Sequence, residues 1–299
     1  MYQYHAYGLI ITSELKLNGL TENNNEKHDV IIRFGITPTI LKNSIVQNNN
    51  QMINEHQFLI TIPDVARFYV QNGNEIIIEK LPDSNEGDIQ VFLMGTVFAY
   101  VLQYREYLVL HGSAILFKDH AIIFSGNSGA GKSTTAMSFA QKGYIVLTDD
   151  LVAIKTNSNG QLELIPGWPR LKLWHDALDH FKENTDNLIK VQNKLNKFEF
   201  PIQNSVVNAI PINSFYELNI GNSNEIELHK VTNKLDKLNL FIKNTFRYYM
   251  LKGLAKSGVH LKQCTILANS IKTNIVNRPH SSFTIDQLVT KLEYDIINN

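Results

Sequence analysis

The chain has 299 residues, with 28 basic and 28 acidic side chains, a single Cys and 43% apolar residues. A formal charge of zero argues against proteins that bind nucleic acid or anionic membranes, because both classes need an excess of Lys and Arg. The single Cys excludes a disulfide framework and a Cys-based zinc site. The first residues lack the basic-then-apolar pattern of a signal peptide. We therefore expect a soluble, cytoplasmic globular protein.

The zero net charge conceals an uneven distribution. Residues 1–90 hold 6 basic and 11 acidic side chains, whereas residues 230–262 hold 8 basic side chains and one acid, Asp236. An asymmetry of this size indicates a charged ligand or partner, or else a solvated surface. We expect the basic segment, residues 230–262, to face an anionic ligand.

The first eighty residues predict short strands separated by turns. Each candidate strand is rich in β-branched and aromatic side chains, and Asn72-Gly73 is a strong two-residue hairpin signal. The strands are expected at Tyr4–Ile11, Val30–Gly35, Phe58–Ile62, Ala66–Gln71 and Glu75–Lys80. Apolar residues at helical spacing then predict a helix over Ile89–Tyr104.

After residue 107 the pattern becomes that of an α/β unit, in which strand, loop, helix and strand follow one another. The expected elements are strands at Tyr107–Phe117, His120–Ser125 and Tyr144–Thr148, a helix at Lys132–Lys142, a hairpin at 151–165, and helices within 233–270 and 284–297. We predict two domains, a mainly β N-terminal domain at 1–85 and a second domain at 86–299.

Residues Gly126–Ser133, with the sequence GNSGAGKS, match the phosphate-loop pattern G-x-x-x-x-G-K-[ST] in full. Glycines let backbone N–H groups turn toward phosphate oxygens, and the start of the following helix favours the same anion. The Lys132 ammonium can reach the β- and γ-phosphates, and the Ser133 hydroxyl can bind Mg²⁺. We predict that a nucleoside triphosphate is bound by Gly126, Asn127, Ser128, Gly129, Ala130, Gly131, Lys132, Ser133 and Thr134.

Asp149 and Asp150 end the strand YIVLT, shortly after the predicted phosphate loop and its helix. An acid at the end of a neighbouring strand holds Mg²⁺ in P-loop proteins, so both are candidate metal ligands beside Ser133. One carboxylate can serve the metal while the other accepts a proton from an attacking hydroxyl. The alternative is one metal ligand beside a turn-forming Asp. The sequence leaves open which Asp has which role.

His111 ends the strand YLVLH and precedes the phosphate loop by fifteen residues. A His in an apolar strand is either a core residue or, this close to a phosphate loop, a catalytic one. Arg170, Lys172 and Arg247 are candidates to neutralise a transferring phosphoryl group or to hold the acceptor. The alternative for each is a solvated surface charge.

The stretch LHGSAILFKDHAIIFSGNSGAGKSTTAMSFAQKGYIVLTDDLVAI, residues 110–154, resembles the catalytic core of bacterial HPr kinase/phosphorylase. The resemblance implies an α/β fold with the P-loop core that those enzymes share with ATP-dependent phosphoenolpyruvate carboxykinases. The residue patterns add a smaller, mainly β N-terminal domain, which looks unlike that of the HPr enzymes, and a helical C-terminal part. The resemblance also implies ATP and Mg²⁺ as cofactors. Lys132 and Ser133 would hold phosphates and metal, the Asp149/Asp150 pair would supply the base and a metal ligand, and His111 would line the reaction centre.

The match loosens outside this core. The glycine-rich segment E-I-R-G-[LV]-G-[IV] of the HPr enzymes does not follow, and IPGWPRLKLWHDAL, Ile165–Leu178, stands in its place. The layout is closer to the HPr-kinase-like proteins of modified-peptide gene clusters, such as the lasso-peptide precursor kinases. The segments that resemble theirs are Tyr4–Leu9, Pro166–Trp174, Asn244–Arg247 and Arg278-Pro279. Because Arg170 and Arg247 lie within such segments, we count both among the candidate catalytic residues.

The function expected from these features is that of a serine kinase. It would transfer the γ-phosphoryl group of ATP to a Ser or Thr hydroxyl of a peptide or small protein, such as a modified-peptide precursor. One alternative is a small-molecule hydroxyl kinase or carboxykinase-like enzyme on the same fold, and another is a non-catalytic nucleotide-binding regulator. The expected partners are the acceptor and, since oligomers are usual for HPr-type enzymes, further copies of the chain, with neither nucleic acid nor membrane.

Overall fold

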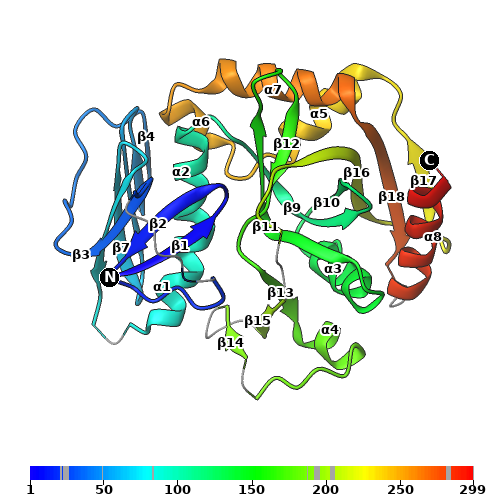
Figure 1. Ribbon diagram of the computed structural model, residues 1–299, viewed down its shortest axis with the longest axis horizontal. Coiled ribbons are helices and arrows are strands. Elements are labelled where there is room, and N and C mark those ends of the chain that lie inside the picture. The colour runs from blue at the N-terminus through cyan, green and yellow to red at the C-terminus, as the bar shows by residue number, and fades with distance from the viewer. Residues whose placement is uncertain are drawn as a thin grey trace.

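The N-terminal part of the chain is built around a twisted sheet (Figure 1). The computed structural model describes residues 1–298 except 21, 23–26, 49, 83, 187, 192–195, 203–205 and 281–283. In sheet order the strands are β1 (Tyr2–Ala6), β2 (Leu9–Ser13), β3 (Val30–Phe34), β8 (Glu75–Lys80), β7 (Ala66–Gln71), β6 (Gln57–Ile62), β5 (Gln51–Ile53) and β4 (Val46–Asn48). Buried residues alternate with more exposed ones along β2 and β8, as expected for a sheet with one face in a core.

The strand expected at Tyr4–Ile11 is wrong in one respect, because the chain turns back within it. Tyr7 and Gly8 both have positive φ, 54° and 68°, and they join β1 to β2 as an antiparallel hairpin. A tyrosine at the first turn position gave no hairpin signal, because left-handed backbone is uncommon outside Gly, Asn and Asp. The predicted strands at β3, β6, β7 and β8 are confirmed to within one residue at either end.

A long helix lies against this sheet and ends where the second sheet begins. It comprises α1 (Glu86–Phe92), a π-helical turn η1 (Leu93–Val97) and α2 (Phe98–Tyr104). Asn85 caps its start by accepting a hydrogen bond from the backbone N–H of Asp88. The helix buries its apolar residues with the sheet, for example Tyr100 stacked on Phe58. The predicted helix is confirmed, whereas a π turn has no sequence signature. The division of the chain at residue 85 stays a prediction.

The second sheet holds the phosphate loop. Its strands, in sheet order, are β10 (His120–Ser125), β9 (Leu108–Phe117), β11 (Ile145–Thr156), β12 (Leu162–Ile165), β16 (Ile210–Gly221), β18 (Lys272–Pro279) and β17 (Glu227–Lys230). β10 also pairs with β16, so the sheet curves until its edge strand β10 meets β16. The strand predicted at 144–148 and the first strand of the hairpin predicted at 151–165 form one continuous strand, β11, with an irregularity after Val146.

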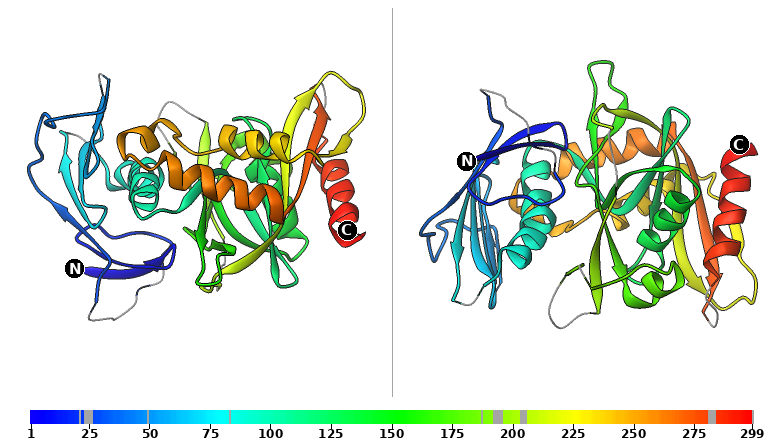
Figure 2. Two further views of the ribbon diagram at one scale, coloured as in Figure 1. Left: turned by 90° about the horizontal axis from the view of Figure 1, so that it is seen from above. Right: turned by 60° about the horizontal axis from the view of Figure 1, so that its bottom comes forward.

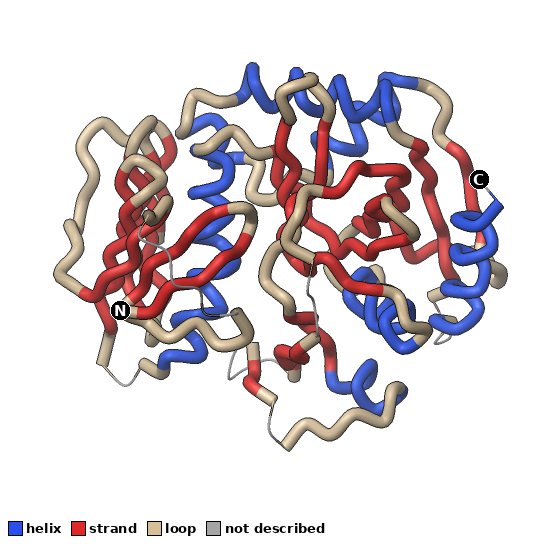
Figure 3. Tube along the Cα trace, viewed as in Figure 1, coloured by secondary structure: helices blue, strands red, loops and turns tan. Residues whose placement is uncertain are grey.

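Helices cover the second sheet on both faces, as Figures 1 and 3 show. α5 (Lys234–Lys243) and α7 (Ser257–Ser270) pack on one face, whereas α3 (Lys132–Gln141), α4 (His175–His180) and α8 (Ile285–Asn298) pack on the other. The short α6 (Tyr249–Gly253) reaches across to the first sheet. A small sheet of β13 (Arg170–Trp174), β15 (Lys197–Pro201) and β14 (Ile189–Lys190) lies beside α4. The protein is therefore of mixed α/β class.

The expectation of a helical C-terminal part is only partly correct. Helices α5 to α8 account for most of residues 233–298, but β16, β17 and β18 also come from the last third of the chain. β16 pairs in parallel with β10, and β18 pairs in parallel with β16, so strands from the last third of the chain lie beside the strand that precedes the phosphate loop. Within the described residues, no helix is both long and apolar enough to cross a membrane.

Candidate active site

The loop Gly126–Gly131 lies between the end of β10 and the start of α3. Gly126, Gly129 and Gly131 have φ angles of 131°, 83° and 105°, in the region that favours glycine. At Gly126 a Cβ atom would also lie 2.2 Å from the carbonyl oxygen of Leu218 on β16. The loop can therefore take this path against β16 only with glycine at its first position. Gly131, the last residue of the loop, precedes the first turn of α3. The free N–H groups at the N-terminus of α3 point into the cleft.

Two cations hold the loop. The Lys132 Nζ donates hydrogen bonds to the carbonyl oxygens of Gly126 and Asn127, at 2.9 and 3.0 Å. From β18, the Arg278 Nε donates to the carbonyl of Ala130 and its Nη2 to that of Gly129, both at 3.0 Å. Burial lowers the pKa of Lys132. Arg278 was not among the predicted site residues, although its Arg-Pro pair belongs to a segment that the resemblance had marked.

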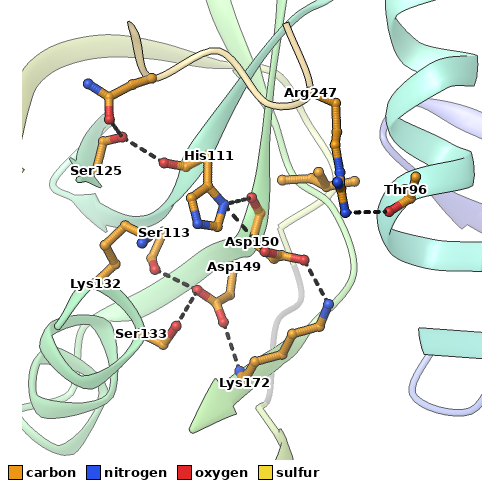
Figure 4. A network of polar contacts seen from close by, with 12 residues as sticks. Thr96, His111, Ser113, Ser125, Lys132, Ser133, Asp149, Asp150, Lys172 and Arg247 are labelled. Carbon is orange, nitrogen blue, oxygen red and sulfur yellow. Dashed lines mark hydrogen bonds and ion pairs between the residues drawn. The ribbon is translucent and has the colours of Figure 1, made fainter. Parts of the chain in front are cut away.

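Asp149 is surrounded by hydrogen-bond donors (Figure 4). Its Oδ1 accepts from the Ser133 hydroxyl at 2.9 Å and from the Ser113 hydroxyl at 2.5 Å, and its Oδ2 accepts from the backbone N–H of Lys172 at 2.8 Å. Its side chain is almost fully buried. Ser113 was not predicted, yet it stands two residues after His111 on the same face of β9, a spacing that could have identified it.

Asp150 faces a different set of groups. The Lys172 Nζ lies 2.7 Å from its Oδ2, and the His111 Nδ1 lies 3.4 Å from its Oδ1. Burial favours the neutral acid, but the Lys172 ammonium and then His111 outweigh it and hold the pKa of Asp150 well below its usual range. Consecutive side chains of a regular strand point to opposite faces. Here Asp150 has φ +70°, and this left-handed residue lets both carboxylates line one cleft.

His111 is held by its backbone at the junction of β9 with the C-terminal segments. Its N–H donates to the carbonyl of Asn244 at 2.8 Å, and its carbonyl accepts from the Ser125 hydroxyl at 2.6 Å. The same hydroxyl lies 2.9 Å from the Asn244 Oδ1. Burial lowers the pKa of His111 below 6.5 despite the nearby Asp150, so the ring is neutral at pH 7. Its side chain reaches the carboxylate rather than the core.

The two candidate arginines lie in different places. The Arg247 guanidinium lines the cleft, is exposed, and donates from Nη2 to the Thr96 hydroxyl at 3.3 Å (Figure 4). Arg170 does not line it among the described residues: its Nε donates to the carbonyl of Asn18 at 3.3 Å and its Nη1 lies 3.9 Å from the buried Glu199 carboxylate. Lys172, two residues along β13, is the one that reaches the carboxylate pair.

Most of the candidate site residues line one cleft of about 860 Å³, bounded by the phosphate loop, β11, β13, the helix turn η1 and the loop before α6. They include His111, Lys132, Ser133, Asp149, Asp150, Lys172 and Arg247. The charged lining of the cleft comprises the basic residues Lys132, Lys172, Lys197, Lys243, Arg247 and Arg278 and the acidic residues Asp149, Asp150 and Asp176. The excess of positive charge suits a polyphosphate.

The basic segment at residues 230–262 contributes less to this cleft than we expected. Of its basic residues, Lys243 and Arg247 line the cleft. Lys256 instead pairs with Glu106, its Nζ 2.5 Å from the carboxylate, and the Lys237 Nζ donates to the carbonyl of Ile271. The expectation that the whole segment faces an anionic ligand is therefore wrong, because α5 and α7 turn most of these side chains away.

The donor set at Asp149 fits Mg²⁺. Ser133 and Asp149 present two hard oxygen donors within hydrogen-bond distance of each other. Magnesium in phosphate-transfer sites is held by one or two protein oxygens and completed by phosphate and water. Within the described parts of the chain, no cluster of three or more His, Cys, Asp or Glu side chains forms a self-sufficient metal site. Ser133 and Asp149 would hold the ion, together with the phosphates.

His260 supports the loop that carries Arg247, and we expect it to make the fold sensitive to acid. Its Nε2 lies 2.8 Å from the Thr245 hydroxyl, it is 4% exposed, and burial lowers its pKa to about 4. Between pH 6.5 and 4 the unfolded chain binds this proton and the folded chain does not, so stability falls as the pH falls. We expect about 3 kcal/mol to be lost across this window.

Chemical denaturation of the wild type and of His260→Gln at pH 7 and pH 4 measures that contribution. The variant should lose less stability between the two pH values than the wild type loses. An equal loss in both proteins would mean that the His260 proton does not contribute.

Comparisons with known proteins show one distant relationship in sequence. No family model matches the chain. The chain is 26% identical over 178 residues to HPr kinase/phosphorylase from Prosthecochloris aestuarii, an alignment that covers 56% of this chain and 48% of that protein. It therefore spans about half the length of this relative. Among solved structures, the HPr(Ser) kinase/phosphatase from Coxiella burnetii aligns with 64% of this chain and 91% of that chain, with a TM-score of 0.33 and 11% identity.

Proposed function

We propose that the protein is a kinase that uses ATP and Mg²⁺ to phosphorylate a Ser or Thr hydroxyl of a peptide or small protein. The observation that carries the proposal is that two consecutive carboxylates contact different groups. Asp149 faces Ser133 and the phosphate loop, whereas Asp150 faces His111, Lys172 and the open cleft. The distant sequence relationship to HPr kinase/phosphorylase supports a kinase-type enzyme.

The phosphate side of the proposal rests on Gly126–Thr134. The loop N–H groups, the Lys132 ammonium and the Arg278 guanidinium would bind the phosphates of ATP. Lys132 now donates to two loop carbonyls, and it would exchange these for phosphate oxygens. When bound at Ser133 and Asp149, Mg²⁺ supplies positive charge that offsets the negative charge of the phosphates.

The acceptor side rests on Asp150. The acceptor oxygen forms a bond to the γ-phosphorus while the bond from that phosphorus to the β,γ-bridging oxygen breaks, and ADP leaves. The hydroxyl proton passes to the Asp150 carboxylate. Because the Lys172 ammonium keeps Asp150 ionised, the carboxylate is ready to accept a proton. The transition state of phosphoryl transfer is loose, so the main contributions of the protein are to position the acceptor and to stabilise the charge of the transferred group.

The neighbouring residues position these groups. Neutral His111 lies within 3.4 Å of the Asp150 carboxylate, and its Nδ1 is also 3.2 Å from the Asp150 carbonyl. It therefore fixes the carboxylate and the left-handed backbone of the same residue. We propose Arg247 as the residue that approaches the transferred group, and Arg170 as a tie between β13 and the N-terminal loop at Asn18.

The test is direct assay of phosphoryl transfer. Purified full-length protein is incubated with ATP and Mg²⁺ and, in separate reactions, with an HPr-type protein, serine-containing peptides, and free serine or hydroxy acids. Mass spectrometry reads the gain of one phosphoryl group. We expect transfer to a peptide or protein that requires Mg²⁺. Transfer to the free small molecules alone would indicate a metabolite kinase, and ATP binding with no transfer would indicate a regulator; either would overturn the proposal.

A further inference from the structure

The helix that packs on the N-terminal sheet also forms a wall of the cleft. Gly95 and Thr96 of the π turn η1, together with Val91 and Phe92 before it, line the cleft across from β11. This helix lies between the first sheet and β11 in the views of Figures 1 and 2. π turns inside helices are frequent at functional sites, because the widened turn shifts the backbone toward one side.

Gly95 is the residue of this wall that borders on Asp150 and Lys172. A Cβ atom built at Gly95 would lie 3.8 Å from the Asp150 Oδ2 and 3.8 Å from the Lys172 Nζ, with no closer neighbour outside its own helix. These are ordinary van der Waals separations. The surface of Gly95 therefore borders on the Asp150 carboxylate, the group that accepts the proton in the proposed function.

Neither backbone strain nor packing requires a glycine here. The φ angle of Gly95 is outside the left-handed region, and the space for a methyl group is present. In the same chain Gly253 illustrates the opposite case, since its Cβ would lie 2.5 Å from the Ile53 side chain. Glycine within a helix is destabilising by about 0.5–1 kcal/mol relative to alanine. Residue 95 is therefore a glycine that lowers the stability of the helix, although the surrounding atoms leave space for the methyl group of alanine.

We infer that the space over Gly95 is the seat of the acceptor's hydroxyl-bearing side chain; this rests on the proposed function. An acceptor hydroxyl must come within about 2.6–3.2 Å of the Asp150 carboxylate. A methyl group at residue 95, already 3.8 Å from the Oδ2, would occupy the volume that the acceptor carbon needs. The substrate class is a small side chain with a hydroxyl, as in serine. The rings of Phe92 and Phe246 line the same cleft and suit apolar neighbours of that serine.

The sharpest test compares Gly95→Ala with Gly258→Ala. Gly258 lies in the first turn of α7, is exposed, has nothing within 4 Å of a built Cβ, and does not line the cleft among the described residues. Both variants gain the same methyl group in a helix. Four quantities are measured for each: the free energy of unfolding, the Kd of ATP, the hydrolysis of ATP by water, and kcat/KM for the peptide acceptor.

We expect both variants to be as stable as the wild type or more stable, with unchanged ATP affinity. Gly95→Ala should lower kcat/KM for the acceptor by about tenfold or more, because a displacement of about 1 Å at the reacting atoms is enough for such a loss. Its hydrolysis of ATP by water should be spared, since water is smaller than a serine side chain. Gly258→Ala should behave as the wild type in all four measurements.

Two results would overturn the inference. If Gly95→Ala transfers to the acceptor as fast as the wild type, the space over Gly95 is not the acceptor seat. If Gly95→Ala unfolds or loses ATP binding while Gly258→Ala does not, the glycine serves packing. Failure of the proposed function is distinguishable from both, because the wild type itself would then transfer nothing.

Discussion

Replacing Asp150 with asparagine should lower kcat for phosphoryl transfer by about 10²–10⁴-fold, the range that a positioned general base contributes. The affinity for ATP should change little, since the carboxylate faces His111 and Lys172 rather than the phosphate loop. Asparagine suits the test, because it is among the residues that tolerate the φ of +70° found here. Single-turnover kinetics with a saturating peptide acceptor would measure the loss directly.

The stability of Asp150→Asn is part of this experiment. Lys172 is half-buried and donates to the Asp150 carboxylate at 2.7 Å, and an amide oxygen can accept the same hydrogen bond without offsetting the charge. A double variant, Asp150→Asn with Lys172→Met, removes that unpaired ammonium and separates a folding defect from a catalytic one. If the single variant folds, binds ATP and keeps more than about a tenth of the wild-type kcat, Asp150 is not the base.

Replacing Arg247 with glutamine should lower kcat by about 10³-fold, the lower end of the effect of an arginine that neutralises a transferring phosphoryl group. Its guanidinium is exposed in the cleft, and its Nη2 contacts the Thr96 hydroxyl at 3.3 Å, a bond that a phosphoryl oxygen can replace. The exposed position implies little cost in stability. Kinetics and thermal unfolding on the same preparation would show the two effects separately.

Lys252→Gln is the matched control for Arg247→Gln. Lys252 lies on the short helix α6 of the same basic segment and does not line the cleft among the described residues. The substitution Lys252→Gln removes one positive charge from the basic segment, as Arg247→Gln does. Equal losses of activity in the two variants would show that the summed positive charge of residues 230–262 supports transfer, and that the Arg247 guanidinium has no specific role.

The sequence predicted most of the elements that carry the phosphate loop. The full motif, the apolar strand before it and the helix after it lie where the pattern predicted them, because glycine spacing and helix periodicity are local signals. The strands β16 and β18 were missed. They are embedded in a third of the chain dominated by helical periodicity, and they become strands by pairing in parallel with β10 and with each other.

Within the site, the sequence identified residue types more readily than contacts. The motif and the Asp pair suggested a division of labour, but the assignment of Asp149 to Ser133 and of Asp150 to His111 depends on the left-handed backbone at Asp150. Arg170 and Lys172 are equivalent in an alternating strand. The position of β13 in the fold gives them different partners: Arg170 contacts Asn18, and Lys172 contacts Asp150 on β11.

Other parts of the site come from contacts between distant segments. Arg278 reaches the phosphate loop from a strand nearly 150 residues later, and its hydrogen bonds go to backbone carbonyls of Gly129 and Ala130. Gly95 borders on Asp150 because the helix packs between two sheets. No periodicity or spacing along the chain encodes either contact, so neither could be predicted from the sequence.

In the proposed site, Asp149 serves the metal and Asp150 serves the acceptor. The most direct measurement is the Mg²⁺ concentration that half-saturates phosphoryl transfer, determined at fixed ATP for the wild type, Asp149→Asn and Asp150→Asn. We expect this concentration to rise by about tenfold or more in Asp149→Asn, because that variant loses a carboxylate that binds the metal. In Asp150→Asn it should stay at the wild-type value while kcat falls. A rise in Asp150→Asn with no change in Asp149→Asn, or an equal rise in both, would show that the two carboxylates do not divide the roles in this way.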